Sequence, residues 1–371
     1  MSQDKEEIPK ISFESFYNQE ILPELKELEK ERKQIQQKLV LPLLFVTAVI
    51  AGIIATGRFS PPQNFSWNNF SWRALYHKFN WVLYVIFGIA SLWKLYKNYK
   101  HKVASKFRGE FKNKVIRKIV QYIDPNFRYN PIGKISKKDF DNCGIFPFVA
   151  DNYIGDDLIS GIHKEETVFS FSEVFAKRFV RDHRRRPHLV PIFKGLFFKA
   201  DFNKKFKFVT VVLPDIAEKY LGDFGQKMQG GNMLREELVK LENPEFEKEF
   251  SVYSDSQSEA RYLLSPKLMQ RILDYKDKYG ERISLSFANS NIYVTIPRAK
   301  DLFEPNYFKS IERFDAIEKY YKDLQMMVDI ADELDLNTRI WTKEPKEKKE
   351  DKVRKDNHIG GIGYHGRGVF R

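Results

Sequence analysis

The chain has 371 residues, with 63 basic and 50 acidic side chains and a formal net charge of +13. That length accommodates a membrane segment as well as a large folded domain. Its single cysteine, Cys143, excludes an intrachain disulfide and a Cys2His2-type zinc site within one chain, and fits a reducing cytoplasm.

The N-terminal segment, residues 1–38, predicts a charged cytoplasmic helix. Its helical pattern covers Ile11–Gln37 and has one broad apolar face, made by Leu22, Leu25, Leu28, Ile35 and Leu39. We expect this helix to run directly into the apolar segment that follows it.

Two apolar segments predict a transmembrane helical hairpin over residues 39–98. Leu39–Thr56 contains eighteen residues without a charge, and Trp81–Trp93 contains thirteen. A hydrocarbon core about 30 Å thick requires about twenty helical residues, so the predicted spans are about 39–57 and 79–96. The alternative is that both segments are buried core helices.

The distribution of basic residues predicts how the hairpin is oriented. Lys94–Lys118 contains ten bases and one acid, whereas the connecting loop Gly57–Lys78 contains three bases. Lys and Arg are retained on the cytoplasmic side of a membrane. We therefore expect a two-span membrane protein with both termini in the cytoplasm.

An amphipathic helix is predicted after the second span, ending at Asp124-Pro125-Asn126. Its apolar residues recur at four-residue steps: Val103, Phe107, Phe111, Val115, Ile119 and Ile123. Such a helix either lies on the membrane or packs on the N-terminal helix. On the membrane, its basic side chains and those just before it are expected to contact anionic lipid headgroups: Lys97, Lys100, Lys102, Lys106, Arg108, Lys112 and Lys114.

We predict a cytoplasmic α+β domain for residues 99–342, with an antiparallel sheet flanked by helices. Segments rich in aromatic and β-branched residues predict strands at Val168–Phe171, Leu189–Phe202, Phe206–Leu213, Phe250–Tyr253, Ile283–Phe287 and Ile292–Ile296. Turn sequences at Asn203–Lys205 and Asn289–Asn291 predict two hairpins. Phe171–Val180 fits either a strand or a helix.

Helices are predicted around this sheet. Ser256 and Glu259 have the spacing of a capping box for a helix that reaches about Tyr279, and Tyr307–Leu334 is the last predicted helix. The absence of strand–helix alternation indicates antiparallel pairing. Residues 343–371, rich in Lys, Glu and Gly, are predicted to be a disordered basic tail.

Several short motifs of the domain occur together in one known family. They are Phe193-Lys194-Gly195, Asp201-Phe202, Leu241-Glu242, Phe246-Glu247, Val252-Tyr253-Ser254 and Glu259–Leu264. The chain resembles a bacterial membrane protein family catalogued as domain of unknown function three-one-three-seven. The resemblance implies a membrane-anchored cytoplasmic α+β domain and brings no catalytic residues with it.

The most concentrated charge of the domain lies at His183–His188, with the sequence His-Arg-Arg-Arg-Pro-His. One interpretation is a contact to phosphate or acidic lipid by Arg184, Arg185 and Arg186, because guanidinium groups match phosphate oxygens in bidentate pairs. The other is a solvated loop before the strand at Leu189. His163, His183 and His188 lack the spacing of a zinc hydrolase, so no metal site is predicted.

An acidic run between Leu241 and Arg261 also allows two interpretations. A hydrolase would need two of its carboxylates to converge. The structural interpretation, which we favour, is an exposed strand approach and a helix start where Arg261 pairs with Glu247 or Glu249. The glycines of Gly222–Gly231 match no phosphate or dinucleotide loop, and no cofactor is predicted.

These observations favour a binding or scaffolding protein over an enzyme. Its expected partners are the lipid bilayer, anionic headgroups and a protein at the membrane, while the juxtamembrane position of the basic residues argues against nucleic acid. The alternative is a membrane-proximal enzyme, such as a hydrolase of a lipid or phosphate ester. Such an enzyme would gather Asp201, Glu242, Arg261 or His183 in a concave site.

Overall fold

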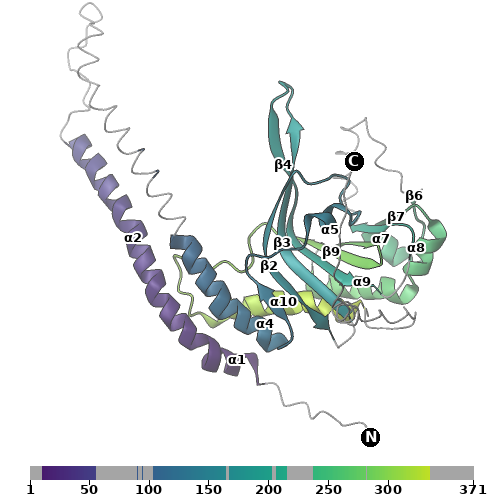
Figure 1. The fold of residues 1–371 in the computed structure, drawn as a ribbon, viewed down its shortest axis with the longest axis horizontal. Helices are drawn as coiled ribbons and strands as arrows, with labels where there is room; N and C mark the ends of the chain where they lie inside the picture. The colour runs from purple at the N-terminus through teal and green to yellow at the C-terminus, as the bar shows by residue number, and fades with distance from the viewer. Residues whose placement is uncertain are drawn as a thin grey trace, which may run out of the picture.

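A nine-stranded antiparallel sheet forms the centre of the part of the chain that the structure describes (Figure 1). The computed structural model describes residues 11–55, 90, 94, 103–163, 167–202, 206–214, 237–280 and 282–334. The strand order is β1-β2-β3-β4-β9-β8-β5-β7-β6. The strands are β1 (Arg128–Asn130), β2 (Asn152–His163), β3 (Thr167–Arg181), β4 (Pro187–Asp201), β5 (Thr210–Pro214), β6 (Glu237–Leu238), β7 (Phe250–Ser254), β8 (Ser284–Ala288) and β9 (Asn291–Pro297).

One of the two predicted hairpins is confirmed. Strands β8 and β9 pair directly, and both connecting residues have positive φ, 53° at Asn289 and 59° at Ser290, as a two-residue primed turn requires. The other hairpin prediction is wrong, because β4 pairs with β3 and β9 while β5 pairs with β7 and β8. Residues 203–205 themselves lie outside the described residues.

Strand β3 settles the ambiguous segment Phe171–Val180, which is extended throughout and pairs with both β2 and β4. Strands β1 and β2 were not predicted. Strand β2 contains Gly155, Asp156, Asp157 and Gly161, which are residue types with low strand propensity. It is held in the sheet by pairing on both of its edges.

The helices of the domain are α5 (Lys137–Asp141), α7 (Pro244–Glu249), α8 (Gln257–Leu263), α9 (Pro266–Tyr279) and α10 (Phe314–Glu333). The single helix predicted from Ser256 to Tyr279 is therefore two helices. Pro266 disfavours helical backbone at the residue before it, and the Ser265 hydroxyl instead accepts the Leu268 N–H as an N-cap at 3.4 Å. Gly280, with φ of 62°, ends α9.

Both faces of the sheet are covered by apolar side chains. On one face, residues of the helical layer such as Ile272, Leu324 and Ile119 form one buried cluster with Phe198 of β4. On the other face, Phe197 packs with residues from α5 and the segment after it, including Phe140 and Cys143. The alternation of Phe197 and Phe198 is the period-two pattern of a strand buried on both sides.

The predicted N-terminal helix is present and continues into the first apolar segment. It begins with α1 (Phe13–Phe16) and a π turn, η1 (Tyr17–Ile21), and then runs as α2 (Leu22–Ala55). Leu25, Leu28 and Ile35 are buried against the domain. Figure 1 shows the C-terminal end of α2 extending away from the sheet.

A buried ion pair fixes α2 to the segment that precedes α10. Arg32 donates two hydrogen bonds to the Glu29 carboxylate, at 2.8 and 2.7 Å, and a third to the Tyr307 carbonyl at 2.7 Å. Glu29 also accepts the Ile311 N–H at 3.2 Å. This bidentate geometry is strong and directional.

The second predicted amphipathic helix packs on the first, which was one of its two predicted alternatives. Residues 103–111 are helical, followed by a π turn, η3 (Lys112–Ile116), and α4 (Arg117–Ile123), which ends at Asp124 as predicted. Lys118 contacts Glu24 at 3.1 Å, and Lys114 contacts Glu27 at 3.0 Å.

The predicted hairpin of residues 39–98 lies mostly outside the described residues. Within 39–55 the α2 backbone is helical, but few side chains are described, and of 79–96 only Ala90 and Lys94 are described. Within the described residues, no helix has the length and apolar character of a membrane span. The tail 343–371 and the glycines of Gly222–Gly231 also lie outside the described residues.

Candidate functional site

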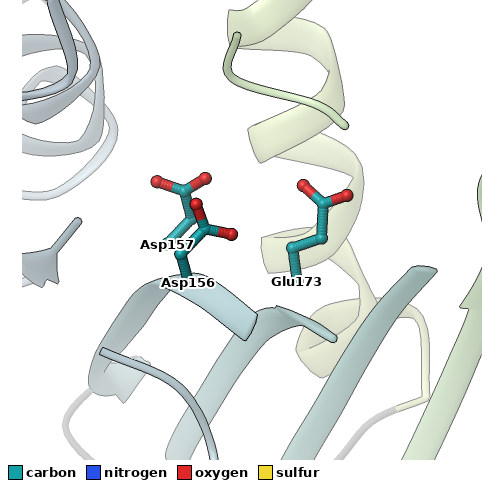
Figure 2. A group of neighbouring side chains, drawn as sticks. All are labelled: Asp156, Asp157 and Glu173. Carbon is teal, nitrogen blue, oxygen red and sulfur yellow. The ribbon is translucent and has the colours of Figure 1, made fainter. Parts of the chain in front are cut away.

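A buried ionic cluster lies where the second amphipathic helix meets strands β2 and β3. Asp156 of β2 is the direct cross-strand partner of Glu173 in β3, so their side chains share one face of the sheet. Asp157 has φ of 57° at a register shift in β2, which turns its carboxylate to that same face instead of the opposite one. Figure 2 shows the three carboxylates raised from the same side of the sheet.

Gly155 permits the close strand approach at this bulge. A Cβ atom there would lie 2.3 Å from the Glu173 carbonyl oxygen, which is inside any permitted contact. The sequence Gly-Asp-Asp therefore places two successive carboxylates beside β3.

Lys112 supplies the cation of the cluster. It is the first residue of the π turn η3, and its Nζ atom lies 2.7 Å from both Asp156 Oδ2 and Asp157 Oδ2. The Lys112 side chain is 3% exposed and the Asp157 side chain 1%. The π turn thus places a buried lysine on a helix whose other described bases are at least partly exposed.

Three more side chains complete this part of the cluster. Tyr129 of β1 donates its hydroxyl to Asp157 Oδ1. Glu304, in the segment after β9, lies 3.3 Å from Lys112 Nζ and pairs with Arg108 at 2.6 Å. The cluster therefore joins a helix, the strands β1, β2 and β3, and the segment after β9.

Glu173 occupies the edge of the cluster that faces the segment after β9. Its carboxylate accepts the Leu302 N–H at 3.0 Å. Next to it, Lys194 of β4 pairs with Asp301 at 2.7 Å and donates to the Ala299 carbonyl at 3.1 Å. These bonds hold residues 299–304 against the end of the sheet.

Burial and charge act in opposite directions on the pKa values of the cluster. Burial raises the pKa of Asp157 to about 6, although Lys112 opposes the shift. Burial raises the pKa of Glu173 to about 8; the Leu302 N–H opposes this, and the Asp301 carboxylate adds to it. For Lys112 burial alone would lower the pKa, but Asp157 and Asp156 outweigh it and raise the value, so the ammonium stays charged.

Asp156, Asp157 and Glu173 are also the group in the described residues with the spacing to hold a metal ion. Their oxygen atoms lie within 4.8 Å of one another, and carboxylate oxygens suit hard cations. The ammonium of Lys112 already lies at hydrogen-bonding distance from two of them. A divalent ion would have to displace it, so the geometry fits a protein-internal ion cluster.

The segment from β4 through α10 carries much of this arrangement, including Lys194, Asp301 and Glu304. Residues 191–336 match the family model DUF3137, described as a protein of unknown function. The resemblance predicted from the sequence is confirmed over these residues. Lys112, Asp156, Asp157 and Glu173 precede the DUF3137 segment, so the cluster joins that segment to the sequence before it.

Two other comparisons were made. No curated protein matches the chain. A crystal structure of the mycobacterial trehalose monomycolate transport factor A, TtfA, aligns with 55% of this chain and 90% of that chain, at 11% identity and a TM-score of 0.29. A TM-score of this size does not establish a shared fold.

The structure corrects one predicted lipid contact. Lys112 is buried and paired, so its ammonium is not available to a headgroup. Lys106 is exposed and lies 3.4 Å from Glu110, whereas Arg108 and Lys114 are partly exposed and paired with Glu304 and Glu27. Lys97, Lys100 and Lys102 lie outside the described residues, and for them headgroup contact stays a prediction.

Arg184, Arg185 and Arg186 are exposed in the turn between β3 and β4. The turn is closed by the Asp182 carboxylate, which accepts the N–H groups of Arg184 and Arg186 at 2.8 Å each. Asp182 Oδ2 also accepts Arg186 Nε at 3.1 Å. The predicted anion contact is therefore a surface feature and separate from the buried cluster.

Two of the four residues proposed for a hydrolase, Asp201 and His183, lie at opposite ends of β4. Asp201 ends β4, whereas His183 lies in the turn before the start of that fifteen-residue strand, about 50 Å away along the chain. A pocket of the described part of the chain is lined by residues of α4 and β1, including Arg117 and Tyr129, and by none of the four candidates. His163 instead hydrogen-bonds Asp332 at 2.8 Å.

The acidic run at Leu241–Arg261 has a structural role, but not through the predicted pairs. Arg261 Nε donates to the Lys240 carbonyl at 3.0 Å, while Glu249 pairs with Lys276. Half of the capping box is present, since the Ser256 hydroxyl accepts the Glu259 N–H at 3.3 Å. The Glu259 carboxylate instead accepts the Lys207 N–H at 2.7 Å, which ties α8 to the segment before β5.

Cys143 is buried, and burial raises the pKa of its thiol to about 12, which disfavours the thiolate. The acidic residues of the cluster were not singled out from the sequence, and Lys112 was assigned a different role. The available signal was the pair Asp156-Asp157 between two apolar pairs, Tyr153-Ile154 and Leu158-Ile159. In a strand that is covered on both faces, two adjacent acids bury at least one carboxylate, which then needs a cation or hydrogen-bond donors.

Proposed function

We propose that this chain is a membrane-anchored binding or scaffolding protein of the bacterial inner membrane, with both termini in the cytoplasm. Residues 39–98 form its two-span anchor. The α+β domain engages a membrane or protein ligand beside the bilayer. The proposal assigns no catalytic step to the domain.

The observation that carries this proposal is the continuity of α2. Its first half is packed on the domain through Leu25, Leu28 and the Glu29–Arg32 pair, and the same helix continues to Ala55 through the charge-free segment that begins at Leu39. A helix that leaves its domain and becomes wholly apolar requires a nonpolar environment for its second half. A bilayer supplies that environment.

A binding role accounts for the cluster better than catalysis does. An active site needs a group left free to act on substrate, and carboxylates with raised pKa values are candidates. Here Asp157 is hydrogen-bonded to Lys112 and Tyr129, and Glu173 Oε2 accepts the Leu302 N–H, while the buried Glu173 Oε1 makes no hydrogen bond within the described residues. These bonds support an interpretation of the cluster as the joint that holds α2, the sheet and residues 299–304 in one arrangement.

The experiment is a topology assay combined with alkaline extraction. A reporter fused after Arg371 is expected to be active only as a cytoplasmic marker, and one inserted near Asn68 only as an external marker. The chain is expected to stay in the pellet after carbonate treatment, and to be released from it when Val46 and Ile50 are replaced by Arg, because charge at a span centre is costly. Replacing the exposed Lys138 and Lys248 by Glu is the control and leaves extraction unchanged. Cytoplasmic activity of the Asn68 reporter, or extraction of the wild-type chain, refutes the proposal.

A further inference from the structure

The β3–β4 hairpin projects beyond the body of the domain, toward the top of the view in Figure 1, as does the C-terminal end of α2. Most of its residues from Arg181 to Pro191 are exposed. A free-standing hairpin has little stability of its own, and this one is an extension of two long strands that are paired within the sheet.

One face of this projection combines apolar and basic side chains. Phe179 and Leu189 are direct cross-strand partners, and their exposed fractions are 58% and 40%. Arg181 and Pro187, the next pair on the same face, are also exposed. An exposed Phe–Leu pair beside a base is the combination that interfacial membrane binding uses.

The charge of the projection has one sign. Residues 177–191 contain six bases and a single acid, Asp182. That carboxylate is used within the turn by the N–H groups of Arg184 and Arg186 and by the Arg186 side chain. Arg184 and Arg185 therefore remain as exposed cations beyond the apolar pair.

We propose that the tip of the β3–β4 hairpin docks on the anionic surface of the membrane, with Phe179 and Leu189 at the level of the headgroups and Arg181, Arg184 and Arg185 on lipid phosphates. This inference rests on the proposed membrane anchorage and adds a second, peripheral contact to it. Interfacial binding takes an apolar face together with basic residues, and arginine matches phosphate in bidentate pairs. The membrane is favoured over an acidic protein because the hairpin projects to the same side as the C-terminal end of α2, which the proposed function places in the bilayer.

The test places an environment-sensitive fluorophore in the turn of the full-length chain by the substitution His183→Cys. Cys143 is buried, so the label attaches at position 183. The chain is reconstituted with its domain on the outer face of vesicles of phosphatidylcholine alone or with one-third phosphatidylglycerol. We expect quenching by iodide to fall by about threefold or more in the anionic vesicles.

Two variants separate the contributions. The first variant replaces three arginines by Glu: Arg181, Arg184 and Arg185. It leaves the Asp182–Arg186 turn intact and should abolish the protection of the label from iodide. Phe179 and Leu189 replaced by Ser should reduce it while leaving the charge unchanged. The matched control replaces three exposed lysines elsewhere by Glu and should keep the protection: Lys138, Lys248 and Lys309.

Each outcome has one meaning, because vesicle flotation is measured in the same samples. If the chain floats but iodide quenching is equal in both vesicle types, hairpin docking is refuted and the proposed membrane anchor is unaffected. Equal protection from iodide in the Glu variant and in the lysine control has the same meaning. A chain that does not float refutes the proposed function itself. Protection by added RNA, without a response to anionic vesicles, would assign the hairpin to nucleic acid and overturn the inference.

Discussion

The substitution Lys112→Met removes the charge at the centre of the cluster and keeps an unbranched side chain of similar length. Asp157 would then be buried with one remaining hydrogen-bond donor, Tyr129, and Asp156 would lose its pair. Removing one partner from a buried ion pair costs about 3–5 kcal/mol. For a domain of this size each kcal/mol lowers Tm by about 2–4 °C, so we expect a drop on the order of 10 °C at pH 7.

The loss should depend on pH in one direction. The pKa of Asp157 is already raised to about 6 by burial, and loss of the Lys112 ammonium raises it further. A carboxyl whose pKa is higher in the folded state binds more protons there, so folding gains stability as pH falls. The difference between variant and wild type should therefore shrink from pH 8 to pH 5.

The measurement is thermal unfolding of the full-length chain in mild detergent, followed by circular dichroism across that pH range. Lys106→Met is the matched control, because Lys106 lies on the same helix, is 79% exposed and pairs with Glu110 at 3.4 Å. Exposed pairs of this kind contribute under about 1 kcal/mol. Equal small shifts for the two variants, or a loss at Lys112 that is independent of pH, would refute a charge-bearing role for the cluster.

Three further predictions use the same melting assay. Burial raises the pKa of Glu173 to about 8, so wild-type stability should fall as pH rises from 5 to 8. Glu173→Gln should flatten this dependence of stability on pH and raise Tm at pH 8. Parallel pH profiles of Tm for the variant and the wild type would contradict the prediction. Ser256→Ala removes the N-cap of α8 and should lower the free energy of unfolding by about 1 kcal/mol. Ser258→Ala, two residues later in the first turn of the same helix, should lower it by less. Ser290 has φ of 59°, so Ser290→Val should cost about 1–2 kcal/mol while Ser290→Gly keeps wild-type stability; equal melting of the two would remove the turn argument.

Local features of the fold were predictable from the sequence. The β8–β9 hairpin follows from two segments rich in β-branched and aromatic residues around Asn289-Ser290, and the end of α4 follows from Asp124-Pro125. Non-local pairing was not predictable. Strand β4 lies between β3 and β9, and no short-range signal distinguishes β9 from the neighbouring segment at β5.

The candidate site was hidden for the same reason. Lys112 stands among many bases, and its partners Asp156 and Asp157 are 44 and 45 residues away in the chain. Its inward direction depends on the π turn, which the four-residue spacing of Phe107, Phe111 and Val115 does not reveal. Burial of a charge is a tertiary property, so composition alone assigned this lysine to the surface.

The continuity of α2 has a mechanical consequence. A helix of thirty-four residues, about 50 Å long, is clamped near one end by the bonds of Glu29 and Arg32 to Tyr307 and Ile311. A stiff rod held in this way converts a sideways displacement of its free end into torque at the clamp. Load applied near Ala55 therefore reaches first the contacts nearest that end, the buried Ile35 side chain and the Arg32–Tyr307 bond, and forced unfolding of the domain should begin there.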